Sequence, residues 1–162
     1  MSYSSNSDSV KTQYPTQMHK ILDNMEDQNV NIMLIDDDEA SHIIHKINIE
    51  DAGFKLTNVV SCYGVDESIN KLKSILEDET MDTWPDYIFL DINMPRKTGY
   101  DFINEFEIEF KNLNGNNNTP KIYLVSSSIN PRDLLKAKEL NLIQGFQTKF
   151  LEKTFIRSLL AS

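Results

Sequence analysis

Two short apolar runs in this chain end in carboxylates. One run, at residues 87–90, leads into Asp91, and another, at 32–35, leads into Asp36 and Asp37. A short apolar run bounded by turn-forming residues is typical of a buried strand, and the carboxyl ends of parallel strands meet at one edge of a sheet. Carboxylates that lie close together repel each other, and Mg²⁺ prefers oxygen ligands. We therefore expect an anionic pocket that holds a divalent cation.

Two further strand ends carry groups that could assist chemistry at the same edge. Ser126 follows the very apolar run at 121–125, and Lys149 follows a short strand predicted at 145–148. Phosphoryl transfer needs a nucleophile, such as a carboxylate, with cations and hydrogen-bond donors around the phosphoryl oxygens. The four strand ends together therefore predict a phosphoryl-transfer site.

From residue 31 onward, apolar runs alternate with amphipathic stretches. The predicted strands are at residues 31–35, 56–62, 87–90, 121–125 and 145–148. The predicted helices are at residues 39–52, 65–77, 99–111, from Pro131 onward with Asn130 as a cap, and 151–160. This alternation predicts a doubly wound α/β fold, in which a five-stranded parallel sheet has helices on both faces.

The first predicted helix carries an apolar stripe and two histidines. The stripe recurs at helical spacing and is predicted to face the core: Ala40, Ile43, Ile44 and Ile47. His42 and His45 flank this stripe at a spacing that can bind a metal, but no third ligand is evident, so we predict solvated histidines. Asp38 directly precedes the helix and is predicted to cap it.

Length, composition and charge limit the class of protein. A chain of 162 residues, 40% hydrophobic, suits one compact domain, predicted at 31–162, plus a flexible tail at 1–30 with a possible short helix at 16–28. The net charge of −9 argues against a nucleic-acid partner. No apolar stretch approaches the roughly 20 residues that span a bilayer, and the single Cys62 fits a reducing compartment. We therefore expect a cytoplasmic protein without a membrane partner.

The residues at the strand ends resemble those of the receiver domain of two-component response regulators, the CheY-like family. The resemblance covers roughly residues 31–160 and rests on four marks in the expected order: Asp36 and Asp37, the run Leu90–Pro95 followed by Gly99, Ser126, and Lys149. It implies a flavodoxin-like fold with strand order 2-1-3-4-5. Since the printed sequence stops after the fifth helix, it also suggests a stand-alone receiver.

The resemblance implies a role for each marked residue. Asp91 would accept a phosphoryl group from a phosphohistidine on a histidine kinase or a histidine phosphotransfer protein. Mg²⁺ would be held by Asp36, Asp37, Asp91 and the backbone carbonyl of Asn93. Ser126 and Lys149 would bind the phosphoryl oxygens. Such a protein is a phosphoacceptor and not an enzyme with a separate substrate, although it catalyses its own phosphoryl transfer and can lose the group again.

The resemblance also implies a switch. Ser126 would move toward the phosphoryl group, Phe146 would turn inward, and the face formed by the fourth helix, the fifth strand and the fifth helix would then bind a target. Phe146 and Ser126 stand where tyrosine and threonine are commoner in the family. The family also follows its lysine with a cis proline, but Phe150 follows Lys149 here, and because a non-proline cis bond costs about 3 kcal/mol, the sequence leaves open whether this bond is cis or trans.

Two other functions fit parts of the pattern. A phosphohydrolase of the haloacid dehalogenase type would use Asp36 as its nucleophile with Mg²⁺, although residues 36–40 match only the first part of that family's motif. A receiver-like binding module that is never phosphorylated is the third possibility, and the complete set of acids, hydroxyl and lysine argues against it.

Overall fold

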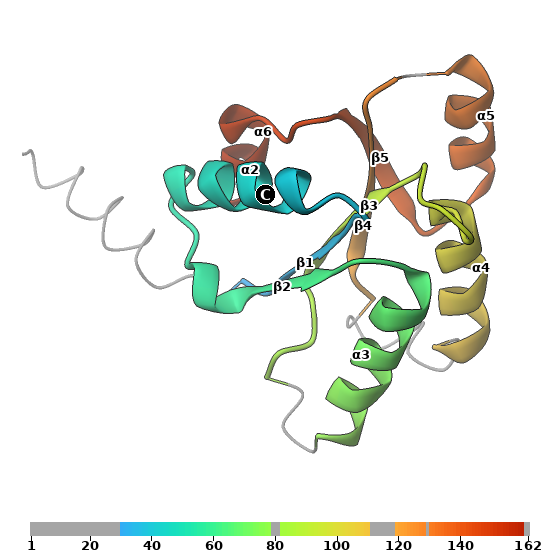
Figure 1. Ribbon diagram of the computed structural model, residues 1–162, viewed down its shortest axis with the longest axis horizontal. Helices are drawn as coiled ribbons and strands as arrows, with labels where there is room; N and C mark the ends of the chain where they lie inside the picture. The colour runs from blue at the N-terminus through green and yellow to red at the C-terminus, as the bar shows by residue number, and fades with distance from the viewer. Residues whose placement is uncertain (1–29, 79–81, 111–118, 129, 161–162) are drawn as a thin grey trace, which may run out of the picture.

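Five parallel strands form the centre of the computed structural model (Figure 1). Their order is β2-β1-β3-β4-β5, so the predicted fold class and strand order are confirmed. The structure describes residues 30–78, 82–110, 119–128 and 130–160. The tail predicted at 1–30, apart from its last residue, and the possible helix at 16–28 lie outside the described residues.

All ten predicted elements are present, with some changed bounds. The strands are β1 (Ile32–Ile35), β2 (Val59–Cys62), β3 (Tyr87–Asp91), β4 (Lys121–Ser126) and β5 (Ile143–Thr148). The helices are α2 (Glu39–Asp51), α3 (Val65–Glu77), α4 (Gly99–Glu109), α5 (Pro131–Glu139) and α6 (Lys153–Leu160). The fourth and fifth predicted helices are therefore α5 and α6. Within the described residues, no helix is long and apolar enough to cross a membrane.

β1 begins one residue later than predicted, at Ile32, and two other strand starts differ from the prediction for local reasons. The strand predicted at 56–62 begins only at Val59, because residues Leu56–Asn58 form a 3-10 turn, η1, closed by a hydrogen bond from the Asn58 amide to the Lys55 carbonyl. β5 begins two residues earlier than predicted, because its pairing with β4 extends to Ile143 across an irregularity in the register. Neither change moves the carboxyl end of a strand.

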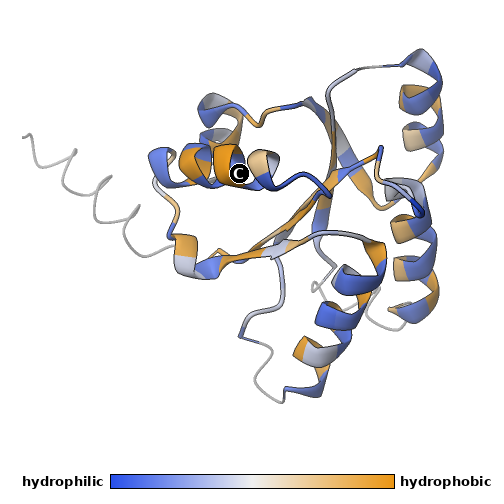
Figure 2. Ribbon diagram, in the orientation of Figure 1, coloured by the Kyte–Doolittle hydropathy of each residue, from blue (hydrophilic) through white to orange (hydrophobic). Residues whose placement is uncertain are grey.

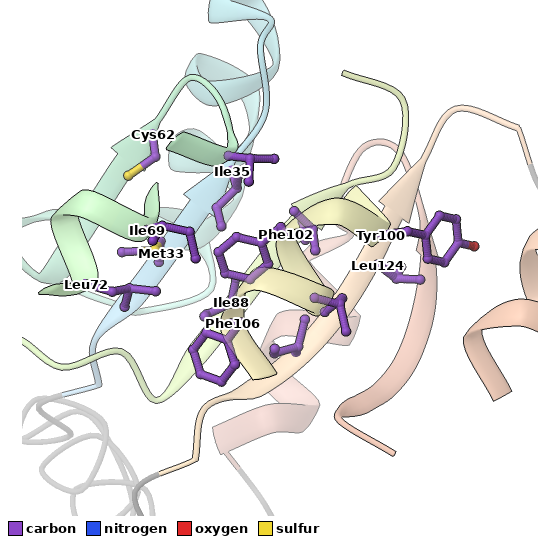
Figure 3. Close-up of a cluster of buried hydrophobic side chains, with 14 of the residues drawn as sticks. Met33, Ile35, Cys62, Ile69, Leu72, Ile88, Tyr100, Phe102, Phe106 and Leu124 are labelled. Atoms are coloured by element: carbon purple, nitrogen blue, oxygen red, sulfur yellow. The ribbon is translucent and has the colours of Figure 1, made fainter. Parts of the chain in front are cut away.

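The helices form a layer on each face of the sheet (Figure 1). α2 and α6 cover one face, where Ile49 and Ile156 belong to the same buried cluster as Phe89. α3, α4 and α5 cover the other face, and Figure 3 shows part of their buried cluster, including Leu72 and Phe102. β1 and β3 are buried on both faces, which explains the apolar runs at 32–35 and 87–90 (Figure 2).

α4 buries the side chains that its sequence pattern predicts. Its buried aliphatic and aromatic residues are Tyr100, Phe102, Ile103 and Phe106, and Phe110 is buried directly after the helix. Thr98 and Asp101 form a capping box, which satisfies backbone amides at the start of the helix. α5 likewise begins as predicted, with Asn130 as its cap and Pro131 in its first turn.

α2 faces the core with a different side from the one predicted. Ile43 and Ile47 are 55% and 53% exposed, whereas the buried residues of the helix are Ser41, His42, His45 and Ile49. The prediction of solvated histidines is therefore wrong, as is the prediction that this apolar stripe is core. The physical reason is that one ring nitrogen of each histidine makes a hydrogen bond to the backbone inside the protein, which offsets part of the cost of burying the ring. Asp38 caps the helix as predicted, accepting from the Ala40 amide.

Candidate functional site

The register of the parallel strands brings the predicted residues to one edge of the sheet. Ile35 of β1 pairs with Leu90 of β3, so Asp36 and Asp91 follow at the same level. On the other side of β3, Asp91 pairs with the residue that precedes Ser126 at the end of β4. The edge therefore collects side chains from four strand ends, as the alternating pattern predicts.

Three carboxylates lie close together at this edge. Carboxylate oxygens of Asp36, Asp37 and Asp91 all lie within 4.8 Å of one another. Asp36 and Asp91 are buried, and Asp37 is exposed. Burial and the neighbouring Asp36 charge raise the pKa of Asp91, while Lys149 acts in the opposite direction. Three hard oxygen donors around one point, two of them shielded from water, fit the ligand preference of Mg²⁺.

Lys149 reaches both buried acids. Its Nζ donates to Oδ2 of Asp36 at 2.7 Å and to Oδ2 of Asp91 at 3.3 Å. Burial lowers the pKa of Lys149, but the hydrogen bonds and charges of the two carboxylates outweigh this effect and raise it. The peptide bond between Lys149 and Phe150, which the sequence left open between cis and trans, is cis.

Asn93 connects the β3 end to the β4 end through contacts that the sequence did not suggest. Its backbone amide donates to Oδ1 of Asp91 at 3.4 Å, and its side-chain Nδ2 donates to Oγ of Ser126 at 3.4 Å. Oγ of Ser126 in turn donates to the Ser128 carbonyl at 3.0 Å. The predicted role of Asn93, a metal ligand through its backbone carbonyl, stays a prediction, and the structure adds a link between Asp91 and Ser126.

Sequence comparison finds no match, either to a protein-family model or to a curated protein. Solved structures do match. A two-component response regulator from Cytophaga hutchinsonii is 26% identical, with a TM-score of 0.70 over 81% of this chain and 93% of that chain. A two-component response regulator from Legionella pneumophila is 20% identical, with a TM-score of 0.66 over 82% of this chain and 95% of that one.

A third match is the signal receiver domain of a signal transduction histidine kinase from Syntrophus aciditrophicus. It is 20% identical, with a TM-score of 0.60 over 82% of this chain and 87% of that chain. This chain therefore has the fold of response-regulator receiver domains. The recognition made from the strand-end residues is therefore confirmed at the level of the fold.

The structure shows a steric reason why residue 99 is glycine. A Cβ atom at this position would lie 2.6 Å from the carbonyl oxygen of Asp91 and 3.1 Å from the Cα of Ile92. Both are backbone atoms that cannot turn aside. The amide of Gly99 also donates to the Ile92 carbonyl at 3.0 Å. Glycine therefore allows α4 to begin directly against the residue that carries the Asp91 carboxylate.

Phe146, the predicted switch aromatic of the receiver domain, is half-buried. It pairs with Leu124 across β4 and β5 and packs against the buried cluster under α3, α4 and α5. Its position beside Leu124, two residues before Ser126, places it on the strand pair that connects the site to the α5 side of the sheet. Its switching role stays a prediction.

Sequence reasoning missed the two buried histidines beside the site. Nε2 of His42 lies 2.8 Å from the Asp36 carbonyl, and Nδ1 of His45 lies 3.5 Å from the Leu151 amide. The one available signal was their position three residues apart, in the helix that directly follows the acids. That signal indicates proximity to the site but not which side of the helix is buried.

Proposed function

We propose that this chain is a phosphoryl-accepting signalling switch in which Asp91 takes the phosphoryl group from a phosphohistidine on a histidine kinase or histidine phosphotransfer protein. The observation that supports it most is the meeting of Asp91 with Asp36, Asp37 and the ammonium of Lys149 at one strand edge. The receiver-domain fold of the solved relatives supports the same partners.

In the proposed step, a carboxylate oxygen of Asp91 attacks the phosphorus atom. The oxygen–phosphorus bond forms as the nitrogen–phosphorus bond breaks, and the departing imidazole takes a proton from solvent. The attacking oxygen must be ionised, and Lys149 favours ionisation against the effect of burial. Lys149 then offers its ammonium to the phosphoryl oxygens.

The acids at the end of β1 would hold the cation. Asp36 and Asp37, together with Asp91 and the backbone carbonyl of Asn93, are the proposed ligands of Mg²⁺. When bound, Mg²⁺ would neutralise charge on the phosphoryl oxygens. The contacts of the Asp36 oxygens, 2.9 Å to the Asp38 amide and 2.7 Å to Lys149, are shorter than those of the Asp91 oxygens, at 3.4 and 3.3 Å, which favours Asp91 over Asp36 as the nucleophile.

The proposed output begins at Ser126. Its hydroxyl is held by the Ser128 carbonyl and contacted by Asn93, and a phosphoryl oxygen on Asp91 would offer it a charged acceptor instead. Movement of Ser126 would shift the segment between β4 and α5, and Phe146 would then turn inward. We infer that the face formed by α5, β5 and α6 binds the downstream target in one of the two states.

Chemical phosphorylation tests this proposal. The protein would be incubated with Mg²⁺ and acetyl phosphate or phosphoramidate, and the intact mass measured for the wild type, Asp91→Asn and Asp36→Asn. We expect a labile phosphoryl adduct on the wild type and none on Asp91→Asn. An adduct that survives in Asp91→Asn and maps to Asp36 would support the phosphohydrolase. No adduct, together with no response to BeF₃⁻, would support a binding module that is never phosphorylated.

A further inference from the structure

We propose that three polar side chains of α2, those of His42, His45 and Asn48, are positioning residues that hold the two halves of the phosphorylation site in register. His42 holds the loop that carries Asp36, and the other two hold the loop that follows Lys149. The inference rests on the proposed function, because it concerns the Mg²⁺ ligand Asp36 and the phosphoryl-binding group Lys149.

The contact of His42 fixes the backbone at Asp36. The Asp36 carbonyl can only accept, so Nε2 of His42 is the donor of the 2.8 Å hydrogen bond. The His42 side chain is 1% exposed, and its other ring nitrogen, Nδ1, has no hydrogen-bond partner among the described residues. Leucine would avoid the unsatisfied Nδ1, but it would leave the Asp36 carbonyl without this donor. The unsatisfied Nδ1 of His42 therefore costs stability, and Nε2 makes the contact with Asp36.

His45 and Asn48 make hydrogen bonds to the backbone amide and the backbone carbonyl of Leu151. Nδ1 of His45 accepts from the Leu151 amide at 3.5 Å, and Nδ2 of Asn48 donates to the Leu151 carbonyl at 2.9 Å. Burial lowers the pKa of His45 to about 4, so its ring is neutral at ordinary pH and Nδ1 is free to accept. Since Leu151 stands two residues after Lys149, these contacts fix the backbone from which the lysine side chain extends.

An aromatic ring lies next to the ring of each histidine. The ring of Tyr63, from the loop after β2, lies 4.5 Å from the ring of His42, and the ring of Phe150 lies 5.7 Å from that of His45. Both aromatic residues are themselves partly exposed, at 46% and 39%. The two histidines beside these rings are only 1% and 3% exposed, and the exclusion of water strengthens their hydrogen bonds.

These contacts give α2 a direct part in the geometry of the site. Asp36 and Lys149 come from strands at different places in the sheet, and their side chains meet at 2.7 Å. α2 contacts the backbone beside each of them, so one rigid helix sets the distance between the two charged groups. Loss of one contact should therefore affect the half of the site that it holds and leave the other half intact.

Mg²⁺ affinity, measured by calorimetry without any phosphodonor, tests the His42 half. We expect His42→Leu to weaken Mg²⁺ binding by roughly tenfold or more, as the loss of partners that orient metal ligands commonly does. His42→Gln should retain most of the affinity, because its amide nitrogen can donate from about the same place. His42→Asn, whose amide is too short to reach the carbonyl, is a second loss variant should the leucine variant fail to fold. Ile49→Val, a fully buried change in the same helix, is the control for altered packing and should bind as the wild type does.

The rate of phosphorylation by acetyl phosphate at saturating Mg²⁺ tests the other half. We expect His45→Leu to slow it on the order of tenfold, because misplacement of a positioned group by a fraction of an ångström is costly, with Mg²⁺ affinity unchanged. His45→Asn, whose side-chain oxygen can accept from the Leu151 amide, should recover most of the rate. In a Lys149→Ala background, His45→Leu should have no further effect, since its influence passes through the lysine.

The outcomes separate this inference from the proposed function. A wild type that binds Mg²⁺ and accepts a phosphoryl group, with folded His42→Leu and His45→Leu variants that match it, would overturn the inference alone. Equal loss in His42→Leu and His42→Gln would also overturn it, because the hydrogen bond would then not be the cause. A wild type that neither binds Mg²⁺ nor accepts the phosphoryl group would contradict the proposed function and the inference with it.

Discussion

α2 and α4 both begin just after a strand that delivers an acid, yet they bury opposite kinds of side chain. α4 follows Asp91 and packs Phe102 and Phe106 into the core. α2 follows Asp36, buries His42 and His45, and leaves its isoleucine stripe exposed. α4, beside Asp91, is therefore held in place by apolar packing. α2, beside Asp36, makes hydrogen bonds to the loops of the site.

The difference follows from what each helix must contact. The start of α4 lies against the backbone of β3 itself, where glycine allows a close approach and aromatic rings fill the space further along. α2 lies beside the loops after β1 and β5, whose buried backbone groups need partners. Variants of the two helices should therefore differ in the size of their effect on stability, in its pH dependence and in their effect on the site.

The largest expected loss of stability comes from the α4 core. Phe106 is 2% exposed and packs against Phe102 and Phe110, with ring centroids 5.8 and 5.0 Å away. Phe106→Ala should lower the free energy of unfolding by about 3–5 kcal/mol, measured by urea denaturation. Ile108→Ala, at a 76% exposed position of the same helix, is the control and should change it by less than about 0.5 kcal/mol. Equal effects of the two variants would contradict the described packing.

Burial of His45 in α2 should make the free energy of unfolding depend on pH. The pKa of His45 is lowered by burial from 6.5 to about 4, so between these values the unfolded chain binds a proton that the folded chain does not. Stability is therefore full above pH 6.5 and falls as the pH drops, by about 3 kcal/mol once the pH is below 4. The difference in urea stability between the wild type and His45→Asn should shift in favour of the variant on acidification. A constant difference would contradict the burial of a neutral ring.

The start of α4 should tolerate no side chain larger than hydrogen at Gly99. Gly99→Ala forces its Cβ against the Asp91 carbonyl and should cost about 1–3 kcal/mol by overpacking, with slower phosphorylation because the acid is displaced. Gly64→Ala, at the start of α3, is the matched control, because a Cβ there meets nothing within 4 Å. Urea denaturation and the acetyl phosphate assay measure both effects, and an unchanged Gly99→Ala variant would refute the close approach.

The smallest effect is expected on the exposed stripe of α2. Ile43→Gln and Ile47→Gln should each change the free energy of unfolding by less than about 0.5 kcal/mol, because both side chains are more than half exposed. Ile49→Ala, on the buried side of the same helix, should cost about 2–5 kcal/mol. If the isoleucine stripe were core, as the periodicity of the sequence suggests, the order of the two effects would be reversed.

Much of the candidate site was predictable, because the rule behind it is simple. A short apolar run must be buried and must end where polar residues begin, so Asp91 and Asp36 had to lie at strand ends. Alternation of strands and helices makes those strands parallel, which brings their carboxyl ends to one edge. The roles of Asp91, Asp36 and Lys149 in phosphorylation remain predictions that the experiments above test.

The links between these residues were not predictable. The hydrogen bond from Asn93 to Ser126 joins positions 33 residues apart, and that between His45 and Leu151 joins positions 106 residues apart. Neither leaves a trace in local periodicity.

The sequence by itself determined which segments form strands and helices, the order of the sheet through its resemblance to receiver domains, and the edge where the acids gather. Only the tertiary structure decided which side of α2 faces inward and which polar atoms join the loops of the site. The physical reason is that hydrophobicity records the cost of burying each side chain alone. A buried histidine becomes acceptable only when distant backbone groups supply its partners, and those partners are brought together by the fold.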